Sequence, residues 1–119
     1  MTFQETLQEF ANATGAKGAV MLAWDGETVA SYAAGAGTEM DLIGAQHAPV
    51  LDIIKEAASR HDPSASVKTV FITSAKARLS ISVIKDNYCL VASLERFTPM
   101  GKVIVESRKA VWRIEEEMG

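Results

Sequence analysis

One stretch of the chain, GAVMLAWDGETVASY at residues 18–32, decides the fold. Its first half, Gly18 to Trp24, is apolar nearly throughout, as expected of a strand that is covered on both faces. Asp25-Gly26 then favours a two-residue type I′ turn, because both central residues of that turn need a positive φ. The segment from Glu27 to Tyr32 returns as a more polar strand. The stretch therefore predicts an antiparallel hairpin.

A helix is predicted before the hairpin. Thr2 and Glu5 have the spacing of a capping box, in which each side chain satisfies a backbone donor at the helix start. Gly15 stands where a left-handed C-terminal cap is needed. The apolar residues between these ends share one face, and they are Phe3, Leu7, Phe10 and Ala11.

A long helix is predicted after the hairpin and a small-residue loop at 33–37. Thr38 with Asp41 resembles a capping pair, and the helix is expected to end near Arg60. Pro49 lies inside the pattern and removes one helical hydrogen bond, so we expect a kink there. The apolar stripe consists of Met40, Ile43, His47, Val50, Leu51, Ile54 and Ala58.

Three strands and a last helix follow. Short connections between Val67–Ser74, Arg78–Ile84 and Tyr88–Leu94 indicate an antiparallel meander. Thr98 is the expected N-cap of the last helix, with Pro99 at its first position. Its buried stripe consists of Met100, Val103, Ile104, Val111, Ile114 and Met118. Five short strands and three helices require a layered arrangement, with the sheet between the helices.

Composition bounds the class of protein. The 119 residues fit a single domain spanning 1–119, and 48% apolar with 23% charged residues is an ordinary soluble globular profile. A net charge of −3 gives no broad field for attracting nucleic acid. No apolar run approaches the roughly 20 residues that cross a bilayer, and the start of the chain lacks the features of a signal peptide. Cys89, as the single cysteine, suits a reducing compartment, so we expect a cytoplasmic protein.

The sequence offers no catalytic, metal-binding or cofactor-binding set. Neither His47 nor His61 has a second ligand three or four residues away, whereas zinc needs three or four ligands. Cys89 has no basic neighbour to activate it and is read as a small buried residue. The glycines of residues 15–18 and 35–37 lack the spacing of phosphate-binding loops. The acidic run Glu115 to Glu117 is read as a solvated chain end. We therefore expect no catalytic residues, metal or cofactor.

Apolar surface in excess of what a monomer needs is the most informative signal. On the middle helix, Leu42, Pro49 and Ile53 extend the apolar arc sideways to about half the circumference, whereas a surface helix usually needs about 100°. Three explanations are open: a protein interface, a deeper groove in the monomer that covers these residues, or a change in the direction of the apolar face caused by the kink at Pro49. Val67–Ser74 is β-prone with a single charge, and as an edge strand it would invite pairing with another chain.

These features together resemble a Roadblock-type domain over nearly the whole chain. The resemblance rests on the order of elements, the segment Gly18 to Ser31 with Asp-Gly at its tip, the kinked middle helix, the meander, and the last helix with Gly101. It implies a layered α/β fold: a five-stranded antiparallel sheet in order 2-1-5-4-3, with the middle helix on one face and the terminal helices on the other. It places Val67–Ser74 at an edge.

The resemblance also implies a dimer. Roadblock family members typically join two sheets at this edge, with the middle helices side by side. The dimer-interface residues predicted on this basis are Leu42, Gln46, Pro49, Ile53, Val67, Thr69, Val70, Phe71, Ile72 and Thr73.

Such proteins are dynein light chains of roadblock type, or scaffolds and regulators of small Ras-like GTPases. Bacterial relatives include a GTPase-activating type that controls cell polarity. We therefore expect a non-catalytic, prokaryotic homodimer that binds a small Ras-like GTPase and is a candidate modulator of its GTP hydrolysis. Arg60, Arg78 and Arg96 are possible arginine fingers, but nothing singles one out and none is assigned.

Two other hypotheses remain open from the residues. A small-molecule-sensing domain on a profilin-like scaffold predicts a ligand pocket inside the domain. An enzyme whose catalytic parts leave no signal is disfavoured by the lack of paired catalytic residues.

Overall fold

The computed structural model describes residues 1–35 and 39–119 of the chain. It confirms the predicted order of elements. The helices and strands are α1 (Phe3–Thr14), β1 (Gly18–Ala23), β2 (Thr28–Ala33), α2 (Met40–His61), β3 (Thr69–Thr73), β4 (Arg78–Ile84), β5 (Tyr88–Leu94) and α3 (Met100–Met118).

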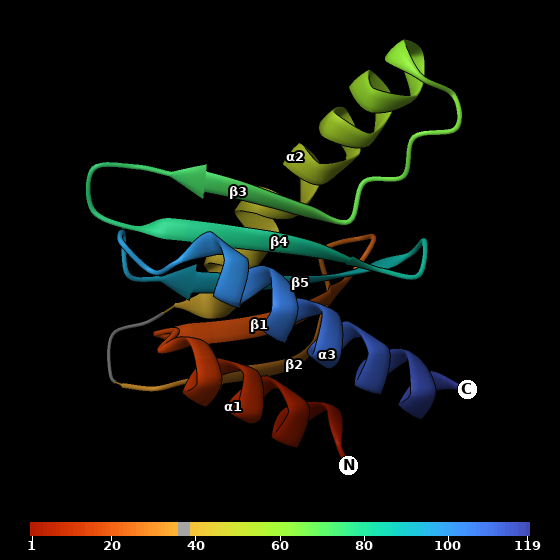
Figure 1. The fold of residues 1–119 in the computed structure, drawn as a ribbon. Helices are drawn as coiled ribbons and strands as arrows, with labels where there is room; N and C mark the ends of the chain where they lie inside the picture. The colour runs from red at the N-terminus through yellow and green to blue at the C-terminus, as the bar shows by residue number, and fades with distance from the viewer. Residues whose placement is uncertain (36–38) are drawn as a thin grey trace.

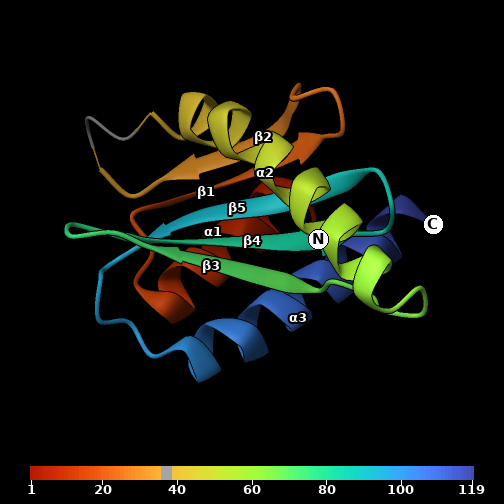
Figure 2. The same ribbon diagram turned by 90° about the horizontal axis from the view of Figure 1, so that it is seen from above.

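The five strands form one antiparallel sheet in the order β2-β1-β5-β4-β3, as the resemblance implied. Helix α2 covers one face, and α1 and α3 lie together on the other (Figures 1 and 2). Side chains of β1 alternate between the two cores. Met21 packs in the core under α1 and α3, whereas Leu22 packs in the core under α2. This is why the strand is apolar throughout, because neither of its faces meets water.

The connection between β1 and β2 differs from the predicted type I′ turn. Gly26 has a positive φ of 87°, but Asp25 does not. The Gly26 amide donates to the Ala23 carbonyl, and the Ala23 amide donates to the Glu27 carbonyl, both at 2.9 Å. The loop therefore has three residues and closes on a left-handed glycine, which is the next most common hairpin. The type I′ prediction was wrong because only the glycine supplies a left-handed conformation.

The start of α1 confirms the capping box. The Glu5 amide donates to the Thr2 hydroxyl and the Thr2 amide donates to the Glu5 carboxylate, both at 3.1 Å. Gly15 takes the left-handed conformation, with φ 72°, that ends the helix. These two features are local, which is why sequence spacing was enough to find them.

The predicted cap of α3 was wrong. The helix begins at Met100 with Pro99 as its N-cap, and no side chain caps it. Pro99 itself has an extended backbone, with ψ 124°, so it is not the first helical residue, and Thr98 lies one position before the cap. The Thr98 carbonyl instead accepts a hydrogen bond from the Arg78 guanidinium at 2.6 Å. That contact ties the loop before α3 to the start of β4.

Helix α2 runs through Pro49 and ends at His61, one residue beyond the predicted end. The predicted cap at Thr38 lies outside the described residues. His47 is half-buried, and its Nδ1 lies 2.7 Å from the Ile43 carbonyl oxygen. This histidine is therefore engaged within its own helix.

Gly44 sets how closely α2 lies on the sheet. A Cβ atom at this position would come within 2.5 Å of Leu22 Cδ1 and 2.7 Å of Val20 Cγ1. Both contacts are too short to accommodate without movement. Glycine therefore permits the close approach of α2 to β1, the strand beside β2.

Candidate protein-interaction surfaces

Strand β3 lies at an edge of the sheet and pairs only with β4 among the described strands. Hydrogen bonds just beyond its two ends show which backbone groups face β4. The Val83 amide donates to the Lys68 carbonyl at 2.9 Å. The Ser74 amide donates to the Ala77 carbonyl, also at 2.9 Å. Even-numbered residues of this segment therefore direct their backbone groups toward β4.

The odd-numbered residues point the other way, because backbone direction alternates along an antiparallel strand. Thr69, Phe71 and Thr73 therefore turn their amides and carbonyls outward. Within residues 1–35 and 39–119, no strand lies on that side to receive them. The strand carries no charged residue, and its register with β4 is regular over all five positions. These are the features of an edge that is open to pairing.

The side chains of β3 already serve the monomer. Phe71 packs against the core under α1 and α3, whereas Val70 and Ile72 pack against the core under α2. The Thr69 and Ser82 hydroxyls lie 3.3 Å apart and share a hydrogen bond. The predicted interface residues Thr69 to Ile72 are thus half-buried at the edge, whereas Thr73 is exposed, and the outward backbone groups of the strand remain unpaired within the described residues.

Helix α2 carries its spare apolar residues on the side opposite the sheet. Its buried residues Met40, Leu51 and Gly44 each stand nine positions from an exposed one, in the pairs Met40 and Pro49, Leu42 and Leu51, and Gly44 and Ile53. Nine residues make about two and a half turns, so the members of each pair face opposite ways. Leu42 is 51% exposed and Ile53 67% exposed. These residues are therefore neither covered by a deeper groove in the monomer nor brought to the buried face by a phase shift at Pro49. The apolar stripe is separate from the buried face of α2.

This stripe, consisting of Leu42, Gln46, Pro49 and Ile53, does not lie wholly beside β3. Leu42 borders a small hollow with Ser31 and Tyr32 of β2. The later turns of α2 cross toward β4 and β3 (Figure 2). The structure thus divides the ten predicted interface residues into the β3 edge and the α2 stripe.

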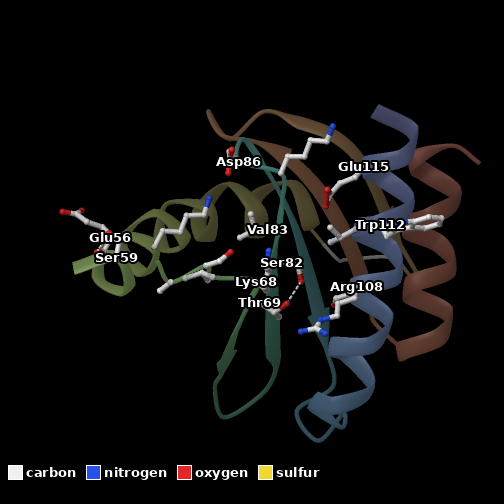
Figure 3. A pocket seen from close by; sticks show the side chains of 17 residues that line it. Glu56, Ser59, Lys68, Thr69, Ser82, Val83, Asp86, Arg108, Trp112 and Glu115 are labelled. Atoms are coloured by element: carbon white, nitrogen blue, oxygen red, sulfur yellow. Dashed lines mark hydrogen bonds between the residues drawn. The ribbon is translucent and has the colours of Figure 1, made fainter. Parts of the chain in front are cut away.

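A hollow of about 760 Å³ opens beside the start of β3, lined by residues of α2, β4 and α3 (Figure 3). Arg108 and Glu115 of α3 point into it, so it presents both signs of charge. The buried Ser107 hydroxyl lines it and has no hydrogen-bond partner within the described residues. The hollow lies at the sheet edge, whereas the small-molecule hypothesis predicted a pocket inside the domain.

The three arginines considered as arginine fingers make local contacts. Arg60 pairs with Glu56 at 2.5 Å on the exposed side of α2. Arg78 binds the loop before α3, and Arg96 donates to the Ala75 carbonyl at 3.4 Å. Two of the three therefore hold loops in place, and the geometry singles out none for catalysis.

Cys89 is buried in β5, and burial raises the pKa of its thiol to about 11. The thiol is therefore protonated at neutral pH, as expected of an inert cysteine. Across residues 1–35 and 39–119, no three His, Cys, Asp or Glu side chains gather as a metal site would require. In the same part of the chain, no helix combines the length and apolar character needed to span a membrane.

Sequence reasoning missed a third surface, on α3. Val105 is 53% exposed and Trp112 64% exposed, and the two are seven residues apart on one side of the helix. Their spacing is visible in the sequence. The sequence alone did not show that Val105 and Trp112 are exposed, because the apolar pattern of α3 indicated only which residues pack on the sheet.

The described residues form a five-stranded sheet between one helix and two, and its β3 edge has no strand partner within them. The Roadblock/LC7 domain model matches residues 2–93. The chain therefore belongs to the Roadblock/LC7 family, a family of regulatory and adaptor domains. The matched residues include α1, α2 and the five strands, except for Leu94 at the end of β5, and they leave out α3.

Solved structures agree on the fold. A Roadblock/LC7 domain from Streptomyces avermitilis superposes with a TM-score of 0.85 at 16% identity, covering 97% of this chain and 96% of that chain. MglB from Myxococcus xanthus gives 0.85 at 14% identity, over 98% of this chain and 94% of that one. A structure described as MglB with tetrameric arrangement gives 0.84 at 19% identity, over 96% and 85%. Among curated proteins, no sequence matches this chain significantly.

Proposed function

We propose that this chain is a non-catalytic adaptor that pairs with a second copy through β3 and binds a small Ras-like GTPase. One observation carries the dimer: the regular, uncharged edge of β3 turns three successive sets of backbone groups outward. An edge of this kind is normally covered, charged or bulged in a protein that stays monomeric. Membership of the Roadblock/LC7 family supports the regulatory role.

The alternation of the backbone restricts the register of such a pair. Two copies of β3 meet antiparallel through their odd-numbered residues, and matching all five positions places Phe71 opposite Phe71 of the second copy. Thr69 then faces Thr73, twice by symmetry. The two sheets become one continuous sheet with a two-fold axis beside Phe71. Each outward amide and carbonyl gains a partner, worth about 1 kcal/mol net for each hydrogen bond.

The α2 stripe is assigned to the GTPase. It faces away from the sheet, so joining two sheets at their β3 edges leaves its outward side uncovered. Exposed Leu42 and Ile53 flank Gln46 and Pro49 along it. An exposed apolar stripe with polar surroundings is typical of a protein-binding surface. The bacterial sources of the similar structures and the single buried cysteine favour a prokaryotic cytoplasm as the setting.

Light scattering after size-exclusion chromatography tests the pairing. A dimer mass, twice 12.8 kDa, is expected for the wild-type chain at moderate concentration. Phe71→Glu is a poor probe, because Phe71 also packs in the core and its loss would unfold the monomer. Thr73→Pro removes an outward amide and an exposed hydroxyl without touching the core, and it should yield folded monomers at this moderate concentration. A Thr73→Pro dimer of unchanged affinity would exclude the β3 edge.

Capture from the native host, with GTP or GDP added in turn, tests the partner. Enrichment of a Ras-like GTPase in one nucleotide state by the wild-type chain supports the proposal. A Leu42→Asp, Ile53→Asp double variant should fold and dimerise but lose the GTPase, because both side chains are exposed. Capture of no GTPase in either state would count against the proposed partner and leave the dimer untouched.

A further inference from the structure

The exposed stripe of α3 is a second, separate apolar surface. Exposed Val105 and Trp112 belong to α3, which lies on the face of the sheet opposite α2 (Figure 1). Trp112 is among the residues that line the hollow beside β3, and its indole ring points away from the centre of that hollow (Figure 3). Gly101 and Glu116 continue the same side of the helix at four-residue intervals, and all four positions are exposed. Neither α2 nor β3 contributes to this stripe.

Charge along α3 is divided between its two ends. Its basic residues precede residue 114, and its last turn holds three glutamates. Some of the charges on α3 have local partners: Arg113 pairs with Glu9, Lys109 with Glu106, and Glu117 with the amino terminus. Exposed Lys102 and Glu116, at opposite ends of the stripe, have no ion-pair partner within residues 1–35 and 39–119.

A helix with this pattern is complementary to itself when a second copy lies antiparallel. Lys102 then faces Glu116 of the second copy, and Val105 packs on its Trp112. Each contact occurs twice, as a two-fold interface requires. At the centre, Lys109 is already neutralised by Glu106, and Arg108 points into the hollow, so like charges do not oppose. A parallel arrangement would instead place like charges together at both ends.

We propose that the α3 stripe, formed by Gly101, Val105, Trp112 and Glu116 with Lys102 at its flank, is a second self-association surface that binds a second copy antiparallel. This goes beyond the proposed function and does not need it. Where β3 also pairs, α3 joins two dimers into a tetramer. Tryptophan at the centre of such a stripe is typical of the residues that dominate binding energy.

Sedimentation velocity over a concentration series tests this. The wild-type chain should pass from dimer to tetramer, and Trp112→Ala should stop at the dimer. Thr73→Pro should leave a dimer held by α3, and Thr73→Pro with Trp112→Ala should be monomeric. Trp24→Ala is the matched control, because Trp24 is 77% exposed in the loop between β1 and β2 and should behave as wild type.

A charge swap tests the antiparallel geometry. Lys102→Glu and Glu116→Lys should each weaken the association through α3 about tenfold at low salt, since each creates two like-charge contacts. The double variant should restore it, and high salt should reduce all three effects. A double variant as weak as the single ones would overturn the antiparallel pairing.

The β3 pairing and the α3 pairing can be disproved independently of each other. If β3 pairing is wrong, the wild-type chain will form only a dimer that Trp112→Ala dissociates and Thr73→Pro does not. If the α3 proposal is wrong, the wild-type chain will remain a dimer at the highest attainable concentration, and Trp112→Ala will match Trp24→Ala in mass.

Discussion

The two edges of the sheet, β2 and β3, show how one sheet protects one edge and leaves the other open. The register between β1 and β2 shifts, so Met21 pairs with Ala30 but Leu22 pairs with Thr28, and Val29 has no partner. Both α1 and α2 contact β2. By contrast, β3 keeps a regular register with β4 throughout. Bulges and covering helices discourage edge pairing, so β3 is the edge suited to a second chain.

The largest expected difference between the edges comes from proline. The Thr73 and Ser31 amides both point outward, Thr73 from β3 and Ser31 from β2. On β2 the Ala34 amide donates to the Lys17 carbonyl, so the even-numbered residues face β1 and Ser31 faces away from it. Thr73→Pro removes two intermolecular hydrogen bonds by symmetry and should weaken the dimer about thirtyfold, at about 1 kcal/mol for each bond. Ser31→Pro should leave the dimer affinity unchanged. Dissociation constants from sedimentation equilibrium measure both.

Thr73→Val is the matched control for the β3 variant. The Thr73 hydroxyl accepts a hydrogen bond from Arg78 Nε at 3.0 Å, and proline removes it together with the amide. Valine removes only the hydroxyl, so its dimer should be near wild type. If Thr73→Pro and Ser31→Pro weakened the dimer equally, β3 would not be the edge that pairs in preference to β2.

A smaller effect is expected where α2 lies over the protected half of the sheet. Gly44→Ala forces α2 away from β1 and should lower the free energy of unfolding by about 1–3 kcal/mol, as overpacking does. Gly101→Ala in α3 meets no atom within 4 Å and should raise it by up to about 1 kcal/mol. Urea unfolding measures both. A stable Gly44→Ala variant would show that α2 can shift without cost.

Amide hydrogen exchange gives a finer comparison on the wild-type chain. The Phe71 and Thr73 amides should exchange quickly at low concentration and become protected as the dimer forms, because the second copy accepts their hydrogen bonds. The Ser31 amide should exchange at the same rate throughout. Concentration-independent exchange at Phe71 would place the dimer contact elsewhere than β3.

The smallest effect is expected at the centre of the sheet, at Cys89. Its pKa of about 11 in the folded state exceeds the ordinary value of 9.0. Between these values the unfolded thiol ionises while the folded thiol keeps its proton, so Cys89 lowers stability as pH rises through that window. Cys89→Ala should reduce the loss of stability between pH 9 and about 11, measured by urea unfolding. An identical pH dependence in the variant would contradict the shift.

Sequence reasoning succeeded where one segment contains its own evidence. The Thr2 and Glu5 pair and Gly15 fix the ends of α1, because capping involves residues within four positions. The apolar run of β1 revealed a strand buried on both faces. The type of turn at Asp25-Gly26 was mispredicted, because a left-handed glycine fits both a two-residue type I′ turn and a three-residue loop. The N-cap of α3 was also mispredicted as Thr98, because Pro99 takes an extended backbone and the Thr98 carbonyl binds Arg78, twenty residues away.

The amino-acid pattern by itself determined which segments form helices and strands, and that the protein has apolar surface to spare. Only the tertiary structure decided where that surface lies. Leu42 and Ile53 turned out to face away from the sheet, and Val105 with Trp112 turned out to lie outside the core. The reason is that periodicity reports which residues share a side of a helix, whereas the packing of helix on sheet decides which side meets water.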